Sequence, residues 1–345
     1  MKWLLIACAV VLSAAVMLAP DTQQSSSSES SYQPLMPKLK QQINDINRIT
    51  VMRGEEHLTL YMDNEKQWRV KEASDYPASS AEVRKLLLYL SQSELRDEKT
   101  ANPELLPRLK LDNEQAFTLS LWKDDTLLHT LLLGKITPEK SGTYVRLSPD
   151  AWQSYTATGQ LIVSTNPLDW LFYDLFSVKV SRVQSIDFRL DGHKAYGYQR
   201  EAPNAQLTLS ELPDDKELQQ RYQIVSPAAF IEKLDFTDVV PKEEADGEAL
   251  GRVIISTFDG LKIIFTYYQV EFEPYFAISA KADETIYKKV GNDTQSFSTT
   301  QQEAAAINRR TQGWLYKLGQ YHTNQLTQSY FDIVKDKQTT QGNTP

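Results

Sequence analysis

The chain has 345 residues, 41% of them hydrophobic and 24% charged, which excludes a wholly disordered chain and a multi-span membrane protein. At about 100–200 residues per domain, this length predicts two domains, or one domain with appendages. The 37 Lys and Arg stand against 45 Asp and Glu, and a formal net charge of −8 argues against a general nucleic-acid binder, which needs a basic surface.

The N-terminus carries an uncharged run of seventeen residues, Trp3 to Ala19. As a helix this run would span about 25 Å, just short of a hydrocarbon core of about 30 Å. We interpret residues 1–20 as a membrane anchor, while a cleaved signal peptide with a processing site at Ser13-Ala14-Ala15 is the alternative. Lys2 precedes the run and the next basic residue is Lys38, so the positive-inside rule predicts a cytoplasmic N-terminus and an exported body.

Residues 21–33 are polar and Ser-rich, which predicts a flexible linker with a reach of about 20 Å. A first α+β unit is expected over residues 34–165. It opens with a short helix after Pro37, and an amphipathic helix is expected over residues 79–91. Its strands are expected at residues 49–51, 58–60, 68–70, 117–122, 127–133 and 143–147.

A second α+β unit is expected over residues 183–297, with turns at Asp191-Gly192 and Asp259-Gly260 and a helix at residues 226–234. The order hairpin, strand, helix, hairpin, strand therefore occurs twice, which predicts tandem units with antiparallel sheets that arose by duplication. The strands of this unit are expected at residues 186–188, 195–198, 207–209, 253–258, 261–267 and 275–279.

Two further segments are expected to be helical. Residues 166–182 begin with the aromatic run NPLDWLFYDLF, which predicts a connecting helix wedged between the two sheets, with an exposed partner-binding patch as the alternative. Residues 298–335 form a C-terminal helical segment that Gly313 and Gly319 can break, and residues 336–345 form a disordered tail.

The C-terminal helical segment carries the candidate partner-binding residues. On one helix, Trp314, Leu318 and Tyr321 would lie along the same side, about one turn apart. That side either packs on the protein's own sheet or docks on a membrane partner.

Six short motifs stand out along the chain: Asp75-Tyr76-Pro77, Leu86 to Leu90, Glu98 to Glu104, Leu132 to Lys135, Thr143 to Arg146 and Asn166 to Leu171. Their order and spacing resemble those of a bacterial family, the domain of unknown function 4340. The resemblance covers residues 35–334 and implies envelope proteins encoded near ABC-transporter components of the gliding-motility type, without established catalytic residues. The chain departs from the family pattern at Arg108-Leu109-Lys110-Leu111, where a Gly more often follows the Leu, and this bears on a turn.

No catalytic or metal-binding signature stands out in the sequence. It contains no G-x-S-x-G elbow, no phosphate-binding loop and no G-x-G-x-x-G fingerprint, and its single cysteine, Cys8, excludes a disulfide within the chain. The four histidines are not spaced as metal ligands, and the paired carboxylates are expected in solvated turns. These residues are His57, His129, His193, His322, Asp124-Asp125, Asp214-Asp215 and Glu243-Glu244.

The sequence thus predicts an α+β protein with an N-terminal membrane helix, two tandem units and a C-terminal helix. We expect a single-pass protein of the bacterial inner membrane with its globular part in the periplasm, no cofactor and no metal. Its expected role is that of a non-enzymatic accessory or scaffold for an inner-membrane complex such as ABC transporter subunits. The alternatives are an envelope glycan or lipid hydrolase with a carboxylate pair and a periplasmic ligand-binding module.

Overall fold

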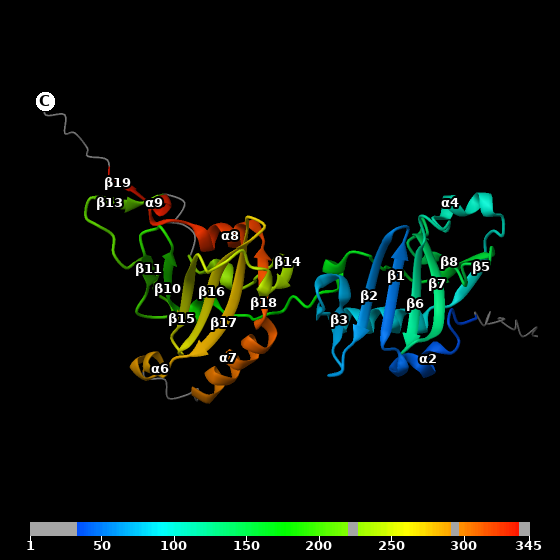
Figure 1. Ribbon diagram of the computed structural model, residues 1–345, viewed down its shortest axis with the longest axis horizontal. Helices are drawn as coiled ribbons and strands as arrows, with labels where there is room; N and C mark the ends of the chain where they lie inside the picture. The colour runs from blue at the N-terminus through cyan, green and yellow to red at the C-terminus, as the bar shows by residue number, and fades with distance from the viewer. Residues whose placement is uncertain (1–32, 220–226, 291–296, 338–345) are drawn as a thin grey trace, which may run out of the picture.

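The computed structural model describes residues 33–219, 227–290 and 297–337. These form a mixed α+β structure with two antiparallel sheets, which confirms the expected fold class at that level (Figure 1). The expected anchor from Trp3 to Ala19 and the linker up to residue 32 lie outside the described residues, as do residues 338–345 of the expected tail. None of the described helices has the length and apolar character needed to cross a membrane.

The first sheet is built from residues 48–158 and is covered by one long helix, α3 (Ser80–Gln92). The helix starts at Ser79, whose hydroxyl accepts a hydrogen bond from the backbone N–H of Glu82. Within the described residues, the strands are β1 (Arg48–Arg53), β2 (Glu56–Met62), β3 (Trp68–Val70), β4 (Tyr76–Pro77), β5 (Leu95–Glu98), β6 (Phe117–Lys123), β7 (Thr126–Ile136), β8 (Gly142–Arg146) and β9 (Ser154–Thr158). The short helices here are α2 (Leu39–Gln42), η1 (Ile43–Asp45), η2 (Lys71–Ala73), η3 (Pro103–Leu105) and α4 (Leu106–Leu109).

The second sheet is built from residues 183–318, and α7 (Phe297–Thr311) packs against two of its strands, β16 and β17. In the described part of the chain its strands are β10 (Val183–Leu190), β11 (Tyr196–Gln199), β12 (Thr208–Leu209), β14 (Phe236–Pro241), β15 (Gly251–Thr257), β16 (Leu261–Val270), β17 (Glu273–Ala282) and β18 (Trp314–Leu318). A separate pair joins β13 (Lys216–Leu218) to β19 (Val334–Asp336), and the remaining short helices are η7 (Lys242–Glu244), α6 (Glu284–Val290), α8 (Gln320–Thr327) and α9 (Tyr330–Ile333).

The two sheets share one strand order. The first runs β4-β3-β2-β1-β6-β7-β8-β9-β5 and the second runs β12-β11-β10-β15-β16-β17-β18-β14. If the hairpin β1-β2 is aligned with the hairpin β10-β11, every strand of the second sheet has a counterpart at the same place in the first. Strand β4 of the first sheet has no counterpart among the described residues. The second sheet carries an insertion, α6 and α7, between β17 and β18. The strands of the expected order are therefore repeated, whereas the helix of the second unit is not, and duplication is our interpretation of the repeated strands.

The connection between the two units is not the expected helix over residues 166–182. Only two short 3-10 turns form there, η4 (Pro167–Trp170) and η5 (Val180–Arg182). After η4 the chain extends along the edge of the first sheet, where the Phe172 N–H donates to the Pro77 carbonyl at 3.0 Å. Pairing with this sheet edge satisfies backbone groups that a helix would have used internally.

The expected helix at residues 226–234 is also much shorter. Ser226 lies outside the described residues, and the structure has one 3-10 turn, η6 (Ala229–Ile231), in which Phe230 and Ile231 are buried. Helix α8 packs against η6 and against β18 of the second sheet.

The C-terminal segment over residues 298–335 is only partly helical. Helix α7 ends before Gly313, whose φ of 87° lies in the left-handed region that favours glycine. The chain then enters the second sheet as β18, between β17 and β14, before α8 begins after Gly319. Pairing with β17 and β14 thus fixes residues 314–318 as a strand, although the spacing of their apolar residues also suits a helix.

An aromatic junction joins the two units. Tyr76, from β4 of the first sheet, is fully buried with its ring 4.9 Å from that of Trp314, 6.0 Å from Phe236 and 6.2 Å from Tyr316. Tyr173 of the connection stacks on Phe236 at 4.4 Å. One hydrophobic cluster of buried residues therefore runs through both sheets.

Arg146, at the end of β8, is fully buried in the first unit, and within the described residues its side chain forms no ion pair at contact distance, although the charge of Asp150 is close enough to act on it. Its guanidinium donates to three backbone carbonyls, those of Ala151 at 2.7 Å, Leu111 at 2.9 Å and Pro149 at 2.6 Å. The side chain holds two loops on the end of the sheet, because each of these carbonyls lies outside regular structure.

Candidate functional site

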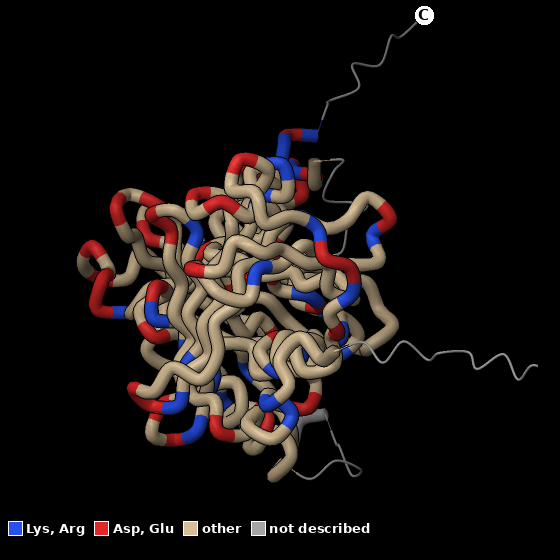
Figure 2. Tube along the Cα trace, turned by 90° about the vertical axis from the view of Figure 1, so that its right-hand side faces the viewer, with Lys and Arg blue, Asp and Glu red and all other residues tan. Residues whose placement is uncertain are grey.

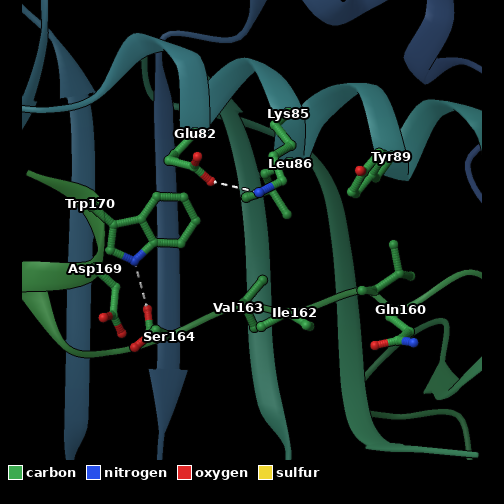
Figure 3. A pocket seen from close by; sticks show the side chains of 11 residues that line it. Glu82, Lys85, Leu86, Tyr89, Gln160, Ile162, Val163, Ser164, Asp169 and Trp170 are labelled. Carbon is green, nitrogen blue, oxygen red and sulfur yellow. Dashed lines mark hydrogen bonds and ion pairs between the residues drawn. The ribbon is translucent and has the colours of Figure 1, made fainter. Parts of the chain in front are cut away.

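A groove runs along helix α3 on the face of the first sheet, and we call it the α3 groove (Figure 3). Its two overlapping parts have volumes of about 390 and 570 Å³. One wall is α3 and the other is the chain of residues 159–164, which follows β9. The lining residues are Glu82, Lys85, Leu86, Tyr89, Gln92, Ser93, Thr158, Gly159, Gln160, Leu161, Ile162, Val163, Ser164, Asp169 and Trp170.

The α3 wall follows from the amphipathic pattern of the helix. Val83, Leu86, Leu87 and Leu90 are buried on the sheet, which leaves Tyr89 beside the groove with about half of its surface exposed. Lys85 and Glu82 form an ion pair at 3.1 Å on the same side of the helix. This wall therefore offers an aromatic face and one paired cation.

Along the opposite wall, buried and exposed side chains alternate, as they do along a strand. Leu161 and Val163 are 4% and 7% exposed, whereas Ile162 between them is 67% exposed. Side chains on an extended chain point to opposite faces in turn, so three successive apolar residues leave the middle one in solvent. Together with the half-exposed Tyr89 on α3, Ile162 places apolar surface on both walls of the groove, and a contiguous apolar patch of this kind is a candidate binding surface.

The groove ends at Trp170, which closes it beside the first turn of α3. The Trp170 indole N–H donates to the Ser164 carbonyl at 3.0 Å, and the Ser79 N–H donates to the Trp170 carbonyl at 2.7 Å. Asp169 lies next to this ring at the same end (Figure 3). The Trp170 end is thus held in place from both walls and carries a carboxylate.

The other end of the groove lies where the chain enters the folded body. Gln92 and Ser93 line it, and the Ser93 carbonyl accepts from the Leu35 N–H at 2.8 Å. The Gln33 carbonyl accepts from the Leu95 N–H at 2.7 Å. Any tether formed by the residues before Gln33 is therefore attached at this end.

The candidate residues Trp314, Leu318 and Tyr321 do not form one helical stripe, which corrects the expectation. Trp314 and Leu318 lie on strand β18, where Leu318 is 3% exposed and Trp314 contacts Tyr76 at the junction between the units. Tyr321 lies on α8 and is 49% exposed. The structure brings none of the three to the α3 groove.

The histidines and paired carboxylates lie apart from the groove as well. His129 contacts Gln42, and His322 contacts the backbone carbonyl of Lys233. Asp124, at a φ of 52°, forms the turn between β6 and β7 and accepts a hydrogen bond from Asn47. Acidic and basic segments are interspersed over the surface of the molecule (Figure 2). Across the described residues, no His, Cys, Asp and Glu side chains gather as a metal site would require.

The structure thus defines a two-unit α+β protein with a peptide-sized groove on its first unit. Residues 68–253 match the model of a family described as Domain of unknown function (DUF4340), and because this is more than half of the chain, the protein belongs to that family. The match includes all the residues that line the α3 groove. No curated protein and no solved structure matches the chain.

One turn of the chain has a backbone conformation that is unusual for its residue. Lys110 follows α4 with φ 56° and ψ 41°, the left-handed conformation in which helices commonly end on glycine. The sequence places a lysine where the resemblance implies a glycine, and the prediction that this departure bears on a turn is confirmed.

Proposed function

We propose that this protein is a non-enzymatic accessory subunit of the cell envelope that holds a partner protein in its α3 groove. The observation that carries the proposal is Ile162, which is 67% exposed between two buried neighbours and faces a groove lined by Tyr89 and Trp170. Covering about 100 Å² of such apolar surface would contribute about 2.5 kcal/mol to binding.

The expected anchor gives the groove a location. Residues Trp3 to Ala19 would cross the inner membrane, and the linker up to residue 33 would reach about 20 Å beyond it. The Gln33 end of the groove would then face the membrane, which favours a partner in the same membrane, such as an ABC transporter subunit.

A photocrosslinking experiment in cells tests the partner contact. A benzophenone amino acid replaces Ile162, and in a matched control it replaces Phe272, which is 91% exposed in the second unit. We expect a protein adduct of defined mass from position 162 and none from position 272. Equal labelling at the two positions, or no protein adduct at position 162, would contradict the proposal.

A second experiment tests the location. A reporter that is active only outside the cytoplasm is fused after Pro345, and we expect activity together with retention in the membrane fraction after a high-salt wash. Release of a shortened soluble protein would support a cleaved signal peptide in place of the anchor.

A further inference from the structure

The wall of the α3 groove at residues 159–164 carries backbone groups that nothing in the described part of the chain satisfies. The N–H and C=O groups of Ile162 and Val163 form no hydrogen bond to any described residue, although the chain is extended there. Gly159 and Leu161 are held on the sheet instead, by Ser141 and by the Thr143 hydroxyl. A fixed, extended segment with unpaired amide groups can accept a further strand.

The side chains of the groove fit such a strand. An added strand exposes its side chains alternately to the two faces, so every second one would contact the apolar floor at Leu86 and Trp170. Ile162 and Tyr89 stand on opposite walls of the groove and would contact the added chain from both sides (Figure 3).

The negative charge at the Trp170 end of the groove favours some ligands over others. Asp169 is exposed there, and its carboxylate forms no ion pair or hydrogen bond with the described residues. Glu82 adds a second carboxylate whose charge Lys85 balances. A Lys or Arg side chain would therefore be favoured at this end, whereas the head group of an anionic lipid would be repelled.

From this geometry we infer that the α3 groove binds an extended peptide segment of a partner protein as an added strand. The segment pairs with the N–H and C=O groups of Ile162, which point away from the edge that Gly159 and Leu161 bond to Ser141 and Thr143. It places a basic side chain beside Asp169. The inference rests on the proposed function, because it specifies how the partner contacts the groove.

The test starts from a random heptapeptide display library that is selected on the full chain and depleted on its Ile162→Asp variant. The best peptide is synthesised, and its affinity is measured by fluorescence anisotropy. In a second series each peptide amide is N-methylated in turn, which removes one hydrogen-bond donor at a time. We expect about tenfold losses at every second position and small effects between them.

Charge reversal tests the contact at the Trp170 end. We expect the Asp169→Lys variant to bind the basic peptide about tenfold more weakly and to bind better when the basic residue of the peptide is replaced by Glu. The Phe272→Asp variant, an equally polar change on the second unit, should bind as the unaltered chain does.

The inference is overturned if no peptide depends on Ile162, if the N-methylation losses lack a period of two, or if charge reversal has no effect. Displacement of the peptide from the full chain by phosphatidylglycerol vesicles, together with direct vesicle binding that the Ile162→Asp variant loses, would also overturn it and identify a lipid as the occupant. In the first three cases a protein adduct from position 162 in cells would leave the proposed function standing, whereas a lipid occupant would contradict the proposed function as well, so the two failures are distinguishable.

Discussion

Replacing Tyr76 by Ala should uncouple the two units of the protein. The Tyr76 ring is fully buried and contacts Trp314, Phe236 and Tyr316, which all belong to the second unit. Truncating a buried aromatic ring to Ala costs about 3–5 kcal/mol. A domain has a stability of about 5–15 kcal/mol, so a loss of this size at the junction would allow one unit to unfold before the other.

The smaller change Tyr76→Phe separates the ring from its hydroxyl group. The hydroxyl donates to the Phe172 carbonyl at 3.2 Å and lies 3.4 Å from the Tyr316 hydroxyl, so its removal should cost about 1 kcal/mol. Burial raises the pKa of Tyr76 from its ordinary value of 10.0 to about 12. Because the folded pKa is the higher one, this contribution is complete below pH 10 and is lost between pH 10 and 12, and the Phe variant should lose stability less steeply there.

Urea unfolding followed by circular dichroism and tryptophan fluorescence checks both changes. We expect coincident transitions for the unaltered chain and for Tyr76→Phe, and two separate transitions for Tyr76→Ala. Tyr89→Ala is the control, since Tyr89 lies half exposed on the first unit. A single transition for Tyr76→Ala with a stability within about 0.5 kcal/mol of the Tyr89→Ala control would refute the reasoning.

Three further predictions concern the first unit. Arg146→Met should cost about 3 kcal/mol in urea unfolding, because three backbone carbonyls lose their donor, and a cost under about 1 kcal/mol would contradict this account. Lys110→Gly should stabilise the protein by up to about 1 kcal/mol by relieving a left-handed residue, whereas Lys135→Gly, in strand β7, should destabilise it. Burial lowers the pKa of His129 below 6.5, aided by Lys38, so stability should fall as the pH drops below 6.5, and His129→Gln should flatten that dependence in urea titrations at successive pH values.

The hairpins and their order could be predicted from the sequence because their determinants are local. The dipeptides Asp191-Gly192 and Asp259-Gly260 mark turns in which the glycines have φ of 73° and 84°. Alternating apolar residues on either side then set which face of each strand is buried. Two such hairpins in each unit are sufficient to show the repeat.

Strand β18 could not be predicted in the same way. Residues Trp314–Leu318 are apolar at spacings that also suit a helix, and their burial follows neither period cleanly. These residues form a strand because they pair with β17 and β14, which come from earlier parts of the sequence. Such tertiary control overrides local propensity.

The α3 groove was partly visible in the sequence. Leu161-Ile162-Val163 is a run of three apolar residues in which an extended chain must turn one outward, and this signal would have pointed to Ile162. The facing wall comes from α3, about seventy residues earlier, so the pairing of the two walls needed the fold. Trp170 was expected as shared core, and its ring is indeed buried while it closes the groove.

The aromatic junction has a mechanical consequence. Gln33 is hydrogen-bonded to the start of β5, which lies at the outer end of the first unit, and β19 lies at the outer end of the second (Figure 1). A pull applied between these two ends is carried from one unit to the other through the Tyr76 contacts and the connection that follows Trp170. That connection is itself fastened on both sides, since Phe172 donates to the Pro77 carbonyl and the Arg310 guanidinium donates to the Leu175 carbonyl at 3.1 Å. The covalent connection and the packed aromatic rings therefore both transmit the force. Under a pulling force we expect the two units to stay together rather than to separate.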